Sequence, residues 1–223
     1  SNSRVLKHRW HSFYLLTHGF KLLSKFIAIR SSINIHLQLY MDDLFKEEFD
    51  MLDKLDWNSM EHIFRPQDPD KIINTDPDED FYITKKETFG DLQIPRKLPS
   101  KTNRTVHNAG FAGDIILRII DKLKKHYNKC FVQHRGTYSY QPGGRCAWHT
   151  NSNAPGMRIY LTWAEEDNKS YFKYFDNETN QIVTKYDKKG WHVNKFTIPH
   201  EGKLWHFVGS DTNRKSVGFL IPV

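Results

Sequence analysis

The chain has 223 residues and a formal net charge of +7. This length is enough to bury a core without disulfides or a structural metal, and two cysteines are too few for a disulfide framework. Aromatic residues make up 14% of the chain, which argues against disorder. No apolar run approaches the ~18 residues of a membrane-spanning helix, so we expect no membrane partner.

The charge is unevenly distributed. Residues 1–40 contain six Lys and Arg and no Asp or Glu, whereas residues 41–80 contain four basic and fourteen acidic residues. We predict a basic N-terminal extension at 1–40, with a targeting peptide as the alternative, and a helical and loop part at 41–112. Residues 81–223 are again basic, with 23 Lys and Arg against 12 Asp and Glu. This charge permits nucleic acid as a partner, although no motif for reading bases is present.

Helical periodicity occurs in two places. Residues 41–55 put their apolar side chains on one face and carboxylates on the other, which predicts an amphipathic helix. An acidic, proline-containing loop is predicted at 66–80. A second helix is predicted at 113–128, with Asp114 as its N-cap. Its apolar face consists of Ile116, Ile120, Leu123 and Tyr127.

After residue 130 the pattern becomes β-rich. Short segments of β-branched and aromatic residues alternate with turn clusters, which is typical of strands. The predicted strands are 130–133, 137–140, 157–163, 170–175, 181–186, 194–198, 204–208 and 216–223. About eight short strands after a long helix predict a mainly β fold, a sandwich or jelly roll supported by N-terminal helices.

Three motifs in this part carry chemistry. The first is Trp148-His149-Thr150-Asn151, in which an extended backbone would turn His149 and Asn151 to the same side. The second is Trp205-His206, and the third is Arg214-Lys215-Ser216.

Their order resembles the Fe(II)/2-oxoglutarate-dependent oxygenase superfamily over roughly residues 113–223. There, a His-x-Asp/Glu pair is followed by a distal His and then by an Arg or Lys. The resemblance is closest to the prolyl 4-hydroxylase-like branch. The matching residues are Tyr140-Gln141-Pro142-Gly143, the pair His149 and Asn151, and Arg158. Small relatives with a similar His-Thr-Asn-Ser motif look like proteins of marine phages.

The resemblance implies a double-stranded β-helix core at 113–223. It also implies Fe(II) held by His149, Asn151 and His206, because two imidazoles and a carboxylate leave one face of the iron open for 2-oxoglutarate and O₂. Arg214, with Ser216 and Tyr140, would bind the far carboxylate of 2-oxoglutarate.

The activity implied is dioxygenase chemistry. Oxidative decarboxylation of 2-oxoglutarate to succinate and CO₂ would be coupled to hydroxylation of a C–H bond. A peptide or protein substrate fits the branch that the motifs resemble. The expected location is the cytoplasm, or the host cytoplasm for a viral protein.

Asn151 departs from the family pattern, which has a carboxylate at this position. Its amide oxygen could bind the metal weakly, or a small anion or water could complete the site. Asp167 and Asp176 could in principle supply a carboxylate, but neither fits the family's placement. Alternatively, the metal site is degenerate and the chain is a non-catalytic protein of this fold, such as a phage virion or accessory binding protein.

Overall fold

A computed structural model describes residues 40–59, 63–65, 104–108, 110–151, 153–201 and 203–222. Its contacts divide the chain into two units, Ser1–Leu44 and Phe45–Val223. All described strands belong to the second unit. The predicted acidic loop, and all of the basic extension except Tyr40, lie outside the described residues. None of the described helices is both long and apolar enough to cross a membrane.

The second unit consists of two helices and ten strands within the described ranges. The helices are α2 (Lys46–Asp53) and α5 (Gly113–Tyr127). The strands are β1 (Ile63–Arg65), β2 (Thr105–His107), β3 (Gln133–Tyr140), β4 (Gly144–His149), β5 (Gly156–Ala164), β6 (Ser170–Asp176), β7 (Gln181–Tyr186), β8 (Gly190–Ile198), β9 (His206–Ser210) and β10 (Arg214–Ile221).

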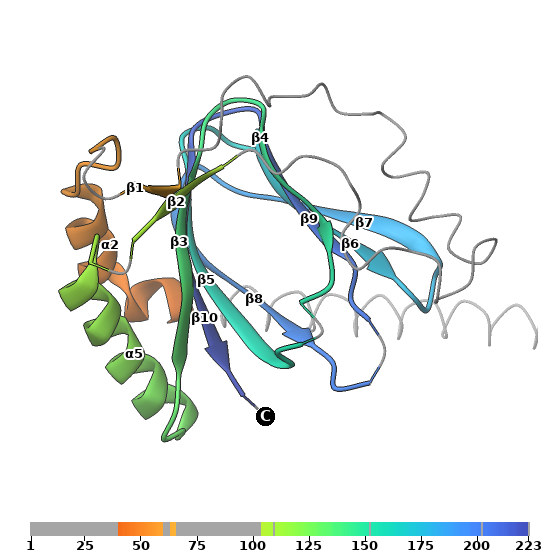
Figure 1. The fold of residues 1–223 in the computed structure, drawn as a ribbon, viewed down its shortest axis with the longest axis horizontal. Coiled ribbons are helices and arrows are strands. Elements are labelled where there is room, and N and C mark those ends of the chain that lie inside the picture. The colour runs from red at the N-terminus through yellow and green to blue at the C-terminus, as the bar shows by residue number, and fades with distance from the viewer. Residues whose placement is uncertain are drawn as a thin grey trace, which may run out of the picture. The chain divides into compact units, whose positions relative to one another are not determined.

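The strands form two antiparallel sheets. One has the order β1-β2-β3-β10-β5-β8 and the other β4-β9-β6-β7. From β3 onward, consecutive strands pass repeatedly from one sheet to the other, and the last two strands insert between earlier ones. This interleaving defines a double-stranded β-helix, or jelly roll. The sequence-based prediction of a mainly β jelly roll with supporting helices is confirmed. In Figure 1 the two sheets lie close together at one end of their strands and spread apart toward the other, with α5 on the outer face of the larger sheet.

Strand β5 shows how the larger sheet separates its two faces. Ile159 and Leu161 are fully buried and point to one face, while Arg158, Tyr160 and Thr162 point to the other. Two fully buried residues of α5, Ile119 and Leu123, belong to the apolar layer on the helix side. The face toward the smaller sheet is more polar.

Three of the sequence-based predictions of secondary structure were wrong. The segments 130–133 and 137–140 are not separate strands, because β3 runs unbroken from Gln133 to Tyr140. Strand β4 was missed because five of its six residues are buried, so its sequence lacks the alternation of a half-exposed strand. In addition, α5 has Ala112 rather than Asp114 at its N-cap. Asp114 lies in the first turn, where its charge favours the helix dipole.

Two leucines of α5 allow a matched test of this packing. Leu123 is fully buried and Leu117 is 61% exposed. We expect Leu123→Ala to lower the free energy of unfolding by about 2–5 kcal/mol, because it leaves a cavity in the core. Leu117→Ala should change it by no more than about 0.5 kcal/mol. Urea denaturation measures both, and equal losses would contradict the assigned helix face.

Candidate metal centre and buried ion pair

His149, Asn151 and His206 converge in the structure. His149 ends β4 and pairs with His206 at the start of β9, so that their ring centroids lie 4.1 Å apart. Asn151 follows β4 with a φ of +50°, a left-handed conformation that Asn tolerates. Its Nδ2 lies 3.1 Å from Nε2 of His206. The predicted trio therefore comes from two paired strands and the turn that follows one of them.

Both imidazoles are held in the same tautomer. Nδ1 of His149 lies 2.7 Å from the carbonyl oxygen of Ala147, and Nδ1 of His206 lies 2.9 Å from that of Leu204. Because a carbonyl oxygen can only accept, each Nδ1 carries the proton and donates it. In a neutral ring the lone pair is then on Nε2, one of the two nitrogens through which histidines bind metals.

The surroundings of His206 keep it neutral. The side chain is 2% exposed, and burial lowers its pKa well below the ordinary value, with His149 lowering it further. Aromatic rings cover it, since Phe196 and Phe172 lie 5.4 and 5.6 Å away between centroids. A low pKa preserves the Nε2 lone pair at neutral pH, because the ring stays unprotonated.

The third member of the trio carries no charge. Within the described ranges, no three His, Cys, Asp or Glu side chains gather around a metal position. Asp167 accepts a hydrogen bond from the backbone of Lys189 in an exposed turn, and Asp176, the last residue of β6, accepts one from the backbone of Glu178. Neither carboxylate therefore replaces Asn151. The donor set fits a divalent metal through two imidazoles and, after a half-turn of the Asn151 amide, through Oδ1.

Tyr140, Arg214 and Ser216 come together on the adjacent strands β3 and β10. The Arg214 guanidinium carbon lies 5.1 Å from the centre of the Tyr140 ring. The Tyr140 hydroxyl accepts a hydrogen bond from Arg104 at 3.4 Å. Ser216 is 1% exposed and pairs in register with Thr162 of β5, so it shares the interior face with Arg214. All three lie where a ligand between the sheets could meet them.

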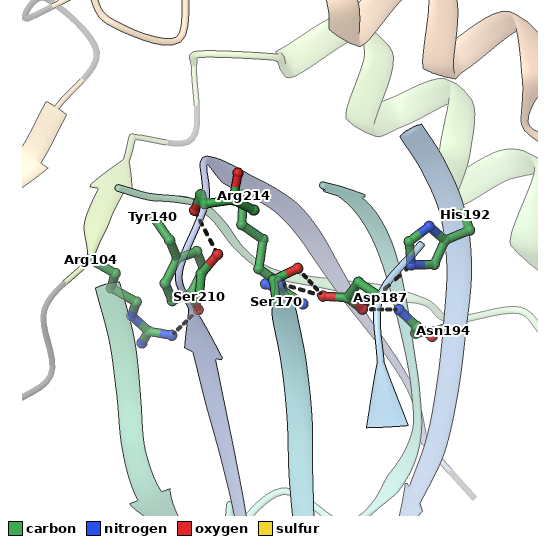
Figure 2. Close-up of polar contacts among 9 residues, drawn as sticks. Arg104, Tyr140, Ser170, Asp187, His192, Asn194, Ser210 and Arg214 are labelled. Carbon is green, nitrogen blue, oxygen red and sulfur yellow. Dashed lines mark hydrogen bonds and ion pairs between the residues drawn. The ribbon is translucent and has the colours of Figure 1, made fainter. Parts of the chain in front are cut away.

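Arg214 is ion-paired within the protein. Its Nε donates to Oδ2 of Asp187 at 2.9 Å, and the two side chains are only 5% and 4% exposed. Ser170 donates to the same oxygen at 2.7 Å, and Asn194 and His192 lie 3.3 and 3.4 Å from Oδ1. Figure 2 shows this cluster around the carboxylate. Sequence reasoning missed Asp187, which follows β7 in an ordinary-looking turn.

The ion pair sets the charge state of Asp187. Burial opposes ionisation, but the Arg214 guanidinium and hydrogen bonds from His192, Arg214 and Ser170 outweigh it and hold the pKa of Asp187 well below its usual value. Both partners are thus charged at neutral pH. Any external carboxylate that approached Arg214 would compete with an internal one that is already fixed.

The two clusters lie at different heights of the smaller sheet. Ser170, which contacts Asp187, and Tyr174, which pairs with His206, are on the same face of β6. Four residues of strand correspond to roughly 13 Å. The polar contents of the barrel are thus divided between an imidazole end and an ion-pair end.

No protein-family model matches the sequence, and no curated protein matches it. Among solved structures, a prolyl-4-hydroxylase from Pseudomonas putida is 16% identical, with a TM-score of 0.41 over 64% of this chain and 83% of the other. A 2OG-Fe(II) oxygenase family oxidoreductase from Burkholderia pseudomallei is 8% identical, with a TM-score of 0.41 over 62% and 76%. A cysteine peptidase from Thevetia peruviana latex is 19% identical, with a TM-score of 0.30 over 41% and 50%. Likenesses this distant carry no argument about activity, and the fold follows from the strand order itself.

The Asp187–Arg214 pair predicts a pH dependence of stability. Asp187→Asn should lower the free energy of unfolding by about 3–5 kcal/mol at neutral pH, because it leaves a buried guanidinium without its counter-charge. The depressed pKa means that the contribution of Asp187 is fully present above its ordinary value of 3.8 and is lost as the pH falls through the lower folded value. The gap between parent and variant should therefore narrow only below about pH 4.

Urea denaturation of both proteins between pH 3 and pH 8 measures this gap. Asp167→Asn is the matched control, because Asp167 lies in an exposed turn. A gap that stayed constant down to pH 3, or equal losses in the two variants, would contradict the role given to the pair.

Proposed function

We propose that the chain is an Fe(II)- and 2-oxo-acid-dependent oxygenase, whose metal is held by His149, Asn151 and His206. The observation that carries the proposal is the pair of facing imidazoles. Each has its Nδ1 proton fixed on a backbone carbonyl, which leaves the lone pair on Nε2. In His206 this lone pair accepts the Asn151 Nδ2–H at 3.1 Å, so the Asn151 amide must turn before a metal binds there. Bound iron would supply the activation of O₂ and the oxidation of the 2-oxo acid. Further support comes from the order of motifs, which resembles that of this superfamily.

In this scheme the protein's own residues bind and orient. His149 and His206 fix the metal without adding charge, and Asn151 turns its amide so that Oδ1 faces the metal. Phe172 and Phe196 beside His206 exclude water from one side, which protects a reactive centre from unproductive reactions. A peptide or protein substrate is the class that the prolyl 4-hydroxylase-like motifs favour.

The far carboxylate of 2-oxoglutarate is assigned to Arg214, with Tyr140 and Ser216 beside it. A guanidinium matches a carboxylate with two parallel hydrogen bonds. In the present arrangement Nε of Arg214 donates to Asp187. For Arg214 to bind 2-oxoglutarate, this hydrogen bond must break, or the guanidinium must bind both carboxylates at once. The dicarboxylate would enter against an existing ion pair, which weakens binding relative to a free arginine.

Two features favour a second candidate function. Asn151 lacks the negative charge that the family pattern places beside the metal, and Asp187 neutralises the arginine that would bind the co-substrate. A jelly roll with both features fits a non-catalytic binding protein, of which a phage virion or accessory protein is one example. Metal affinity separates the two functions, because the enzyme requires a bound metal and the binding protein does not.

Asn151→Asp tests the metal assignment. The substitution is nearly isosteric and adds one negative charge where a divalent metal would lie, so we expect Mn²⁺ or anaerobic Fe(II) to bind at least about tenfold more tightly, since a charge–charge contact is worth several kcal/mol even when strongly screened. Asn153→Asp adds the same charge at an exposed position of the same turn and is the control. Equilibrium dialysis measures both. Absence of binding by the parent and by Asn151→Asp would rule out a metal site at this trio.

Arg214→Ala and Asp187→Asn test whether Arg214 binds 2-oxoglutarate, because the two substitutions should change its affinity in opposite directions. Arg214→Ala should weaken 2-oxoglutarate binding by about 10- to 100-fold, because a charge-assisted hydrogen bond is lost, with little change in metal affinity. Asp187→Asn should strengthen 2-oxoglutarate binding, because it removes the competing carboxylate. Anaerobic titration of the Fe(II)-loaded protein, followed by its visible charge-transfer absorption, measures both. Unchanged affinity in Arg214→Ala would disprove the assignment.

A further inference from the structure

Arg158 is a second arginine inside the barrel, and the described residues give it no carboxylate partner. It is 1% exposed. Its Nη2 donates to the carbonyl oxygen of Ala154 at 2.5 Å, and its Nε has no hydrogen-bond partner among the described residues. None of the ion pairs found between described residues includes it. Burying a charge costs free energy unless the charge is paired, so we expect an anion to bind this guanidinium.

Arg158 belongs to the imidazole end of the barrel. It pairs in register with Phe196 of β8, and the Phe196 ring lies 5.4 Å from the ring of His206. It also reaches the turn that carries the third member of the trio, because Ala154, its hydrogen-bond partner, donates its own N–H to the carbonyl of Asn151. Arg158 therefore lies beside both His206 and the Asn151 turn.

Among the described residues, no buried carboxylate is available to Arg158. The two that are buried are already paired, Glu48 with Lys122 of α5 and Asp187 with Arg214 at the other end of the barrel. The third member of the trio, Asn151, is a neutral amide. A guanidinium with an unused Nε–H is matched best by a planar carboxylate, which accepts two parallel N–H donors.

We propose that Arg158 binds a small carboxylate anion beside His206, and that this anion supplies the negative charge that Asn151 does not. The anion would be a second ligand, separate from the far carboxylate assigned to Arg214. Binding of the anion to the metal-free protein stands independently of the proposed function. Strengthening of metal binding by the anion rests on it.

Acetate is the probe for the metal-free protein. In the presence of a chelator, saturation-transfer NMR on the acetate methyl group measures binding. We expect the parent and Arg118→Gln, an exposed control on α5, to bind acetate equally. Arg158→Gln should bind at least about tenfold more weakly, because it loses a charge-assisted hydrogen bond. A folded Arg158→Gln variant that binds acetate as the parent does would overturn the proposal.

A second measurement needs no substitution in the measured protein, in case Arg158→Gln does not fold. The Nε–H signal of Arg158, identified by its loss in Arg158→Lys, should shift during acetate titration of the parent. A signal that stays unmoved while acetate reaches saturating concentration would equally overturn the proposal.

The anion site and the proposed metal centre can be tested separately by measuring Mn²⁺ binding with electron paramagnetic resonance, with and without acetate. Stronger Mn²⁺ binding with acetate in the parent, and no such effect in Arg158→Gln, supports both. Mn²⁺ bound equally well with and without acetate overturns the coupling but leaves the proposed metal centre standing. Acetate binding without any Mn²⁺ binding would support the anion site and contradict the proposed oxygenase function.

Discussion

Charge between two packed sheets must be neutralised locally, because little water reaches it. Asp187 and Arg214 satisfy this condition as a pair, with Ser170 filling a further acceptor site on the carboxylate. His206 satisfies it by staying neutral, because its burial and the neighbouring His149 lower its pKa well below the ordinary value. Arg158 differs from both, because it is buried and none of the ion pairs found between described residues includes it. The division of the barrel into an ion-pair end and an imidazole end is thus a division between a balanced charge and an unbalanced one.

The interleaved topology brings these groups together from distant parts of the sequence. His149 and His206 are 57 positions apart in the chain but are register partners on β4 and β9. Arg214 and Asp187 come from opposite sheets, β10 and the end of β7. In a jelly roll, successive strands alternate between sheets, so residues that face each other across the barrel are seldom close in sequence. Cross-strand register, rather than local sequence, decides which polar groups meet.

This explains how far the sequence could predict the site. The i and i+2 spacing of His149 and Asn151, followed by a distal His206, carries a recognisable local signature, and the structure brings those three together. Asp187 has no such signature, because a single Asp after a strand is common in turns and only its long-range partner makes it special. Strand β4 was overlooked for a related reason, since burial on both faces removes the alternation that marks a strand.

Asn151 and Arg158 are linked through the backbone of one turn, and this link connects the amide to the charge. Arg158 donates a hydrogen bond to the carbonyl oxygen of Ala154. The N–H of Ala154 in turn donates to the carbonyl oxygen of Asn151. Asn151 itself has a left-handed backbone, which fixes the direction from which its side chain reaches His206. An anion on Arg158 would act on this turn as well as on the local charge. The neutral amide and a guanidinium to which the described residues offer no carboxylate are therefore two parts of one arrangement, in which a carboxylate from outside would take the place of the one that the protein lacks at residue 151.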